Sequence, residues 1–235
     1  MTELSPTRRT TLTREKERGV SEREQLLDLL AEGLIAHIGV TVGDESGSHP
    51  VVLPVAYAVD PDGPDRDGTL YVHGSVAAGW LRRTAGEDGA ATVCVTVTAL
   101  DGLVLARSAF NHSMNYRCGV VIGPARLVDD PAEKARALDL ITDHVVPGQV
   151  AALRPNTRKE LAATSVLAVP LHEASLKTRA GGPEDDQPDI DAGYWAGHVP
   201  LRMVASPVVP DPAAPGPVPE HVQRRAEALG APPAG

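Results

Sequence analysis

The hydrophobic positions along this chain fall into short runs that are rich in Val, Ile, Leu and Ala and are separated by turn residues. Such runs occur at residues 34–42, 49–59, 69–73, 91–98, 103–106, 119–127 and 166–171. β-Branched side chains pack well on a pleated surface but lose rotamer freedom in a helix, so these runs favour strands. Most of the connections between them are short, which predicts antiparallel pairing.

Helical periodicity is confined to four segments of the chain. In the first, Ser21 and Glu24 have the spacing of a capping box, so we expect a helix that Ser21 caps and that ends near Gly33. The other helices are predicted at residues 77–84, 130–145 and 220–229. The segment 130–145 is the clearest of them, because an Asp-Pro pair opens it and its apolar side chains recur on one face.

Several strands joined by short turns, with helices at the periphery, indicate an α+β fold that is mainly β and forms a small antiparallel barrel. We expect a flexible N-terminal segment at residues 1–20, one folded domain at 21–205 and a C-terminal tail at 206–235. Pro, Ala and Gly dominate this tail, and such a composition buries too little apolar surface to offset the ordering of the chain.

Composition and charge restrict the possible partners. Aromatic residues make up 3% of the 235 positions and hydrophobic residues 42%, so the core must be aliphatic. The net charge of −9 argues against a nucleic-acid partner, which requires clustered cations. No apolar run approaches the roughly 20 residues of a membrane span, and residues 1–17 do not resemble a secretory leader. We therefore expect a cytoplasmic protein with no membrane partner and with free thiols at Cys94 and Cys118.

Common catalytic and metal-binding motifs are absent from the sequence. It contains no Gly-x-Gly-x-x-Gly turn, no phosphate loop, no Cys-x-x-Cys and no His-Glu-x-x-His. We therefore expect neither a dinucleotide fold of that type nor a bound metal ion.

Polar residues gather instead at the end of the predicted strand 69–73. His73, Gly74 and Ser75 lead into the predicted helix at 77–84. A glycine there permits close approach of a ligand, and a hydroxyl with free amides suits an anion such as phosphate. The alternative is that Ser75 simply caps the helix.

A denser polar segment, Asn-His-Ser-Met-Asn-Tyr-Arg-Cys at residues 111–118, stands just before the predicted strand 119–127. Arg117 is the candidate for a bidentate contact with phosphate. A hydrogen-bonded structural corner is the alternative. A weaker third candidate is the pair Lys177 and Arg179, whose side chains face one anionic ligand if the strand continues that far.

Five segments, in order along the chain, resemble the pyridoxamine 5'-phosphate oxidase-related, flavin-nucleotide-binding proteins. They are residues 71–75, 97–108, 112–117, 175–181 and 195–197. The central motif is long and specific, the flanking ones are short, and the resemblance extends from about residue 10 to residue 201. It implies an antiparallel split β-barrel homodimer that holds FMN at the subunit interface.

The resemblance also implies which residues contact the cofactor. They are Pro54, Val55, Ala56, His73, Gly74, Ser75, Ser113, Asn115, Tyr116, Arg117, Lys177 and Arg179. His112 and Tyr116 are candidate proton donors beside the flavin, although His112 is equally open to a structural role. Cys118 departs from the family, whose members usually carry Ser directly after the Tyr-Arg pair.

The implied function is an FMN-dependent oxidoreductase that acts on a small molecule, such as a nitro compound or a quinone, with the flavin carrying the hydride chemistry. Pyridoxamine 5'-phosphate oxidase activity itself is not expected, because residues 51–57 lack the cations that the true oxidases use. The alternative is a non-catalytic protein of the same fold that stores a flavin or binds haem through a histidine. FAD, a deazaflavin and haem are therefore the alternative cofactors.

Overall fold

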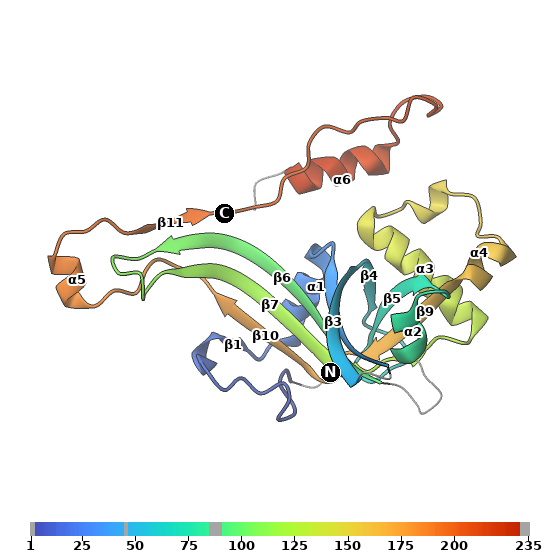
Figure 1. Ribbon diagram of the computed structural model, residues 1–235. Helices are drawn as coiled ribbons and strands as arrows, with labels where there is room; N and C mark the ends of the chain where they lie inside the picture. Colours follow the sequence, from blue (N-terminus) through green and yellow to red (C-terminus); the bar gives the residue numbers. More distant parts are fainter. Residues whose placement is uncertain (1–2, 45–46, 85–90, 231–235) are drawn as a thin grey trace.

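Two antiparallel sheets make up most of the protein, which a computed structural model describes at residues 3–44, 47–84 and 91–230. Among these residues, the larger sheet has the strand order β1-β10-β7-β6-β2-β3, and β11 also pairs with β6. The smaller sheet has the order β4-β5-β9-β8. Figure 1 shows β6 and β7 as long curved neighbours that reach away from the smaller sheet and its helices. This arrangement confirms the predicted mainly-β α+β fold.

The bounds of the elements follow the hydrophobic runs, with differences that are described below. The strands are β1 Gly19–Val20, β2 Ala36–Asp44, β3 Gly47–Val55, β4 Tyr57–Asp60, β5 Thr69–Ser75, β6 Thr92–Leu105, β7 Ser113–Pro124, β8 Arg126–Leu127, β9 Thr164–Pro170, β10 Ala174–Arg179 and β11 Gly197–Pro200. The α-helices are α1 Arg23–Glu32, α2 Gly79–Thr84, α3 Pro131–Val145, α4 Arg158–Ala163, α5 Gln187–Asp191 and α6 Glu220–Gly230. Short 3₁₀ turns lie at Lys16–Arg18 and Val150–Ala152.

The core consists mainly of aliphatic side chains, as the composition predicts, with Tyr57 and Tyr71 buried among them. The main cluster joins α1 to both sheets and includes Leu26, Ile38, Val72, Val97 and Leu167, each no more than 2% exposed. A second cluster packs α3 on the smaller sheet through Tyr71, Ala137, Ile141 and Val166. These two clusters hold the sheets together by close packing, and this packing fixes the strand ends that carry the predicted site residues.

The predicted strand 49–59 is in fact two strands in different sheets. β3 ends at Val55, and β4 begins at Tyr57 in the smaller sheet. Tyr57 is fully buried, and its hydroxyl lies 2.7 Å from the carbonyl oxygen of Leu30 and 2.9 Å from that of Gly33. These contacts turn the Tyr57 side chain toward α1, so the chain leaves one sheet and enters the other at Ala56.

Two predicted runs, 91–98 and 103–106, belong to the single strand β6. The register of its pairing with β7 shifts between Leu100 and Gly102, so Asp101 forms a bulge. Its partner β7 begins at Ser113, and residues 113–117 therefore lie inside a strand. The interpretation of this polar segment as a corner is wrong, because both neighbouring strands supply backbone partners for it.

The predicted helices are present, with one corrected cap. Glu22 rather than Ser21 occupies the N-cap of α1 and makes no side-chain cap hydrogen bond, so the capping-box prediction is wrong. Asp130 caps α3 as predicted and accepts the backbone N–H of Glu133 at 2.7 Å. In the C-terminal region α6 forms as predicted, and His221 Nε2 lies 2.8 Å from Gln149 Oε1, which ties α6 to the connection after α3.

The N-terminal segment, which the sequence predicts to be flexible, makes contacts with the folded domain. Leu4 is 7% exposed within the core, Ser5 N donates to Ala174 O at 2.7 Å, and β1 pairs with β10. An apolar side chain and an open sheet edge thus anchor residues 3–20. Residues 1–2 and 231–235 of the predicted termini lie outside the described residues. None of the helices described here has the length and hydrophobicity that crossing a membrane demands.

Candidate functional site

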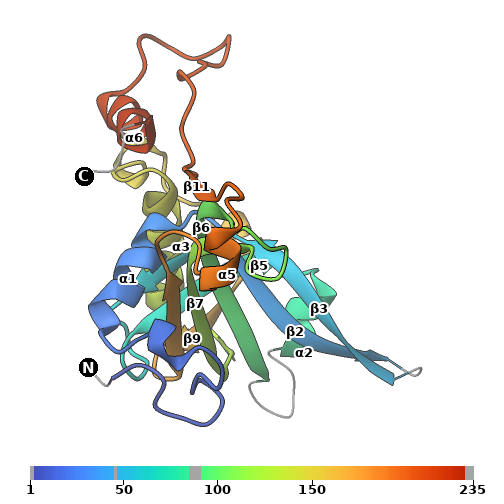
Figure 2. The ribbon, with the colours of Figure 1, turned by 90° about the vertical axis from the view of Figure 1, so that its left-hand side faces the viewer.

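The predicted cofactor residues fall into two separate groups in one protomer. The first group, residues 54–56 and 73–75, lies where β3 gives way to β4 beside the end of β5, since Tyr57 pairs with Val72. The second group, residues 113–117 with Lys177 and Arg179, lies on the neighbouring strands β7 and β10. Because β2 and β6 separate β3 from β7, three strand spacings of about 4.8 Å put roughly 14 Å between these two strands across the sheet. Figure 2 shows the β2–β3 hairpin projecting from the side of the larger sheet.

In the first group, His73 is half-buried on β5, two residues beyond Tyr71 and hence on the same face of the strand. Its Nδ1 is buried and has no hydrogen-bond partner among the described residues. Burial lowers the pKa of the ring, because a charged imidazolium loses more hydration than a neutral imidazole. His73 is therefore neutral at neutral pH.

Gly74 and Ser75 are engaged in local structure. A Cβ atom placed on Gly74 would lie 2.5 Å from Leu81 Cδ1, so a larger residue here would displace the Leu81 side chain of α2. Ser75 Oγ accepts the backbone N–H of Ala77 at 3.2 Å, in a turn that precedes α2. The structure thus favours a role for Ser75 in stabilising this turn over the predicted binding of an anion. Its hydroxyl hydrogen remains available to a ligand.

In the second group, Arg117 is held by two carboxylates. Its Nε and one terminal nitrogen donate to both oxygens of Asp101, at 3.0 and 2.9 Å, and the terminal nitrogens also bind the carboxylate of Glu32 on α1. Hydrogen bonds to Glu32 and then to Asp101 raise the pKa of the guanidinium. Four bonds leave it one free N–H, which weighs against the predicted phosphate contact.

Asn115 and Arg179 form a buried pair, with exposures of 7% and 6%. Arg179 donates to Asn115 Oδ1 at 2.7 Å and to Gly182 O at 3.0 Å, and Asn115 Nδ2 donates to Gly181 O at 3.0 Å. Both side chains therefore fix the loop after β10. Arg179 Nε is also buried and has no partner within the described part of the chain.

Three members of the second group keep polar atoms free. Tyr116 and Ser113 are half-buried, and their hydroxyls make no hydrogen bond to the described residues. Lys177 is also half-buried, and its Nζ donates to Arg14 O at 3.0 Å, which leaves two of its N–H groups for a ligand. Tyr116 and Lys177 therefore remain the better-placed cofactor contacts of this group.

His112, the predicted proton donor, lies in the turn between β6 and β7. The ring is exposed, and its Nδ1 lies 2.8 Å from the carbonyl oxygen of Ser108. A carbonyl only accepts, so Nδ1 carries the hydrogen and Nε2 presents its lone pair. The same turn is held in place by Asp185, whose side chain is 1% exposed and accepts hydrogen bonds from the backbone N–H and the guanidinium of Arg107. The sequence gives no signal for this contact.

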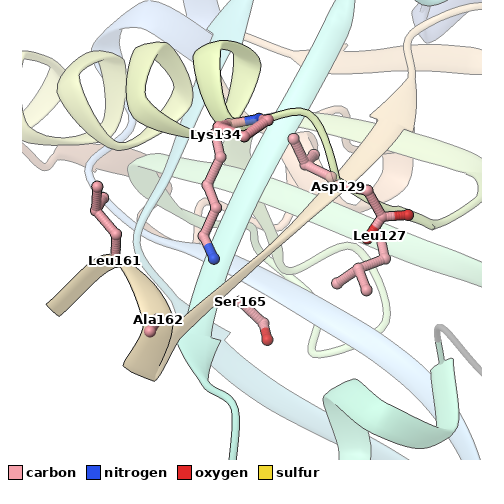
Figure 3. Close-up of a pocket in the computed structure, with 8 residues that line it drawn as sticks. Leu127, Asp129, Lys134, Leu161, Ala162 and Ser165 are labelled. Atoms are coloured by element: carbon pink, nitrogen blue, oxygen red, sulfur yellow. The ribbon is translucent and has the colours of Figure 1, made fainter. Parts of the chain in front are cut away.

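A shallow pocket of about 290 Å³ lies at the edge of the smaller sheet, between α3 and α4. In Figure 3 the side chain of Lys134 points into it, above Ser165. The rest of its lining is mainly apolar, with Leu127, Val128 and Leu161. None of the predicted site residues lines this pocket, so it gives no support to the predicted cofactor site.

The chain is similar to known proteins over nearly its whole length. The model of the pyridoxamine 5'-phosphate oxidase family matches residues 22–178. The FAD and haem binding protein from Mycobacterium smegmatis is 38% identical, with a TM-score of 0.77, and the match covers 88% of this chain and 97% of that one. The flavocytochrome Anf3 from Azotobacter vinelandii is 34% identical, with a TM-score of 0.82 and coverages of 94% and 98%. Curated protein sequences give no significant match.

Proposed function

Because the chain belongs to the pyridoxamine 5'-phosphate oxidase-like split-barrel family, as its sequence predicts, we propose that it is a dimeric electron-transfer protein that binds a flavin and a haem. One observation carries the proposal. The chain is similar, over nearly its whole length, to one protein described as binding FAD and haem and to another described as a flavocytochrome. The proposal favours the binding alternative over the FMN-dependent reduction of a nitro compound or a quinone.

The flavin site that we propose spans two subunits. The two groups of cofactor residues are carried by strands β3 and β7, roughly 14 Å apart across three strand spacings in one protomer, which does not suit one compact ring site. In a two-fold homodimer, any contact between two different patches of the two copies occurs twice. A dimer that brings the first group of one protomer to the second group of its partner therefore forms two equivalent sites.

The described residues suit a flavin in chemical terms. Pro54 and Val52 are exposed on the outer face of β3, with Val52 64% exposed, and give an apolar surface for the isoalloxazine ring. Ser75 and Tyr116 supply hydroxyl donors for its polar edge, and Lys177 supplies a cation for phosphate. Once bound, the flavin supplies the redox chemistry, while these side chains orient it and exclude water. We propose FAD rather than FMN or a deazaflavin, because FAD is the flavin that the name of the 38% identical relative states.

Catalysis on a small molecule is a separate proposal with less support. Tyr116 remains a predicted proton donor because its hydroxyl is unbonded within the described chain, whereas the hydrogen of His112 is already donated to Ser108 O, which weighs against the predicted proton donation by His112. No described contact selects a nitro compound or a quinone. The test below therefore also measures whether the reduced protein reduces such a substrate.

The test is the absorption spectrum of the purified protein, before and after reconstitution with FAD and haemin, with mass analysis of the released flavin. We expect flavin bands, a Soret band and a dimer in sedimentation. Chemical reduction without oxygen, followed by mixing with nitro compounds or quinones, measures any acceptor reduction. A folded protein that takes up neither FAD nor haemin contradicts the proposal, and uptake of FAD alone removes its haem part.

A further inference from the structure

All eight histidines of the chain lie within the described residues, so their availability as iron ligands can be compared. A histidine that binds a metal through one ring nitrogen normally donates the other N–H to a carbonyl or a carboxylate, which fixes the tautomer. His144 and His221 use Nε2 toward Gly33 O and Gln149 Oε1 respectively, which leaves for a metal only Nδ1, the ring nitrogen that the neighbouring Cβ crowds against a porphyrin. The Nδ1 of His73 is buried and has no hydrogen-bond partner among the described residues, so no hydrogen bond there fixes its tautomer.

Of the remaining histidines, His172 is also oriented through Nδ1, by Asp67, but its side chain is only 19% exposed, which leaves little surface for a porphyrin. The rings of His37, His49 and His198 are exposed and have no orienting hydrogen bond to the described residues. His112 is different, since its Nδ1 donates to Ser108 O at 2.8 Å while its ring stays exposed. Its Nε2 lone pair is therefore both oriented and accessible, as an axial ligand of haem iron requires.

The turn that carries His112 is fixed on both sides. Asn111 N donates to Ser108 Oγ at 3.2 Å, and Arg107 is bound through its backbone and its guanidinium to the buried side chain of Asp185. A ligand held by its surroundings loses little entropy when iron binds. The carbonyl oxygen of Ser108 is thus held in position, and its hydrogen bond to Nδ1 fixes the orientation of the His112 ring.

Large apolar side chains flank this turn and are open to solvent. Phe110 is 95% exposed and Met114 53% exposed. β11 pairs Gly197 with Leu105, so the chain just before it, with Tyr194 at 68% and Trp195 at 72% exposure, runs beside the same end of β6 (Figure 1). A porphyrin is a flat apolar ring, and covering such side chains favours its binding by about 25 cal/mol per Å².

From these observations we infer that His112 is an axial ligand of the haem iron and that the Ser108 carbonyl positions it. The inference rests on the proposed haem binding. It places the haem at the outer end of β7, four residues from Tyr116 of the flavin site, or about 13 Å along an extended chain. Flavin and haem then lie near each other beside the same strand, and transfer of electrons between them requires such proximity.

The test compares wild-type protein, His112→Ala and the matched control His198→Ala, which removes an exposed and unoriented histidine from β11. Each is titrated with haemin, and the Soret band and the electron paramagnetic resonance signal are recorded. We expect His112→Ala to lose at least tenfold in haemin affinity and to change its spin state. Added imidazole should restore the wild-type spectrum, while His198→Ala should match the wild type throughout.

His112→Met supplies a second variant, because a thioether in place of the imidazole alters the spectrum and raises the reduction potential. Flavin content and circular dichroism confirm folding of each variant. If His112→Ala and His112→Met bind haemin with the wild-type spectrum and affinity, the assignment of His112 is overturned while haem binding stands. If folded wild-type protein takes up no haemin, the haem part of the proposed function fails, and this inference fails with it.

Discussion

Arg117 on β7 faces Asp101 at the bulge of β6, and its Nε and a terminal nitrogen reach the two carboxylate oxygens at 3.0 and 2.9 Å. This fork-like contact is the strongest geometry for an arginine and a carboxylate. Glu32, at the end of α1, binds the same guanidinium from a second element. The guanidinium thus joins the bulge and the helix to β7.

Arg117→Gln should weaken the fold more than it weakens flavin binding. The variant leaves Glu32 and Asp101 without their cation, and we expect the free energy of unfolding to fall by about 1 kcal/mol, since the group is partly exposed. Urea unfolding measures the loss, and a titration with FAD measures affinity. The control is Arg154→Gln, which removes an exposed ion pair with Glu160 and should leave both quantities close to those of the wild type.

If Arg117 instead grips the flavin phosphate, Arg117→Gln should weaken FAD binding at least tenfold, or by about 1.4 kcal/mol. Such a loss with an unchanged unfolding free energy would contradict the structural role that its four hydrogen bonds give it.

Gly74→Ala should destabilise the protein by overpacking. The added Cβ would lie 2.5 Å from Leu81 Cδ1, and Leu81 is 1% exposed, so the leucine must shift within a filled core. We expect a loss of about 1–3 kcal/mol in thermal or urea unfolding. Leu81→Val in the same chain should recover part of the loss, because it shortens the colliding side chain. A Gly74→Ala protein of wild-type stability that no longer binds flavin would show that the glycine serves the ligand instead.

The fold is predictable wherever a local signal decides the structure. Asp130 caps α3 because its side chain reaches an amide three residues on, and that spacing is visible in the sequence. The break at Ala56 is not visible there, because it depends on hydrogen bonds between Tyr57 and the end of α1, 24 to 27 residues earlier. The polarity of residues 113–117 suggests a corner, yet pairing with strands on both sides makes them extended.

The candidate site is predictable in position but not in chemistry. The segments around His73 and Tyr116 stand out through their polar residues, yet the sequence does not show which polar groups are already satisfied. Arg117 finds Asp101 and Glu32 at separations of 16 and 85 residues, and Arg107 finds Asp185 at a separation of 78. Pairing over such distances is set by the sheet register, which no local pattern reveals.

Stability should fall as the pH is lowered from about 7 to about 5. Burial lowers the folded-state pKa of both His73 and His144 from the usual 6.5. Above pH 6.5 both imidazoles are neutral in the folded and in the unfolded state, so the protein has its full stability. Below pH 6.5 the unfolded chain binds protons more readily than the folded protein does, and the free energy of unfolding falls. Urea unfolding across this range should show a smaller slope for His73→Gln than for the wild type.

The matched control for this measurement is His198→Gln, which removes an exposed histidine of β11. Its slope should equal that of the wild type. Carboxylates such as Glu160, whose pKa Arg154 lowers to about 2, are the same in the variant and the wild type, so their contribution cancels in the comparison. An equal slope for His73→Gln and the wild type would contradict the prediction for His73.

Mixed dimers should reveal whether the flavin site spans two subunits. Ser75→Trp blocks the first group and Tyr116→Ala impairs the second, so a homodimer of either variant should bind little FAD. In a mixed dimer one of the two sites combines the intact groups, and FAD binding should return to about half of the wild-type stoichiometry. Fluorescence titration of dimers purified with two different tags measures this. Absence of any recovery in a verified mixed dimer would argue that each protomer holds its flavin alone.

β6 changes its neighbour part-way along its length. β2 pairs with it at Cys94–Thr96, and β11 pairs with it at Gly102–Leu105, beyond the bulge. The residues that form β11 come after residue 178, where the family match ends. A chain shortened to the matched region would leave that edge of β6 with unpaired amides and carbonyls, and open edges recruit strands from other molecules. The C-terminal extension thus covers this edge of β6, and we expect a chain that ends at residue 178 to aggregate.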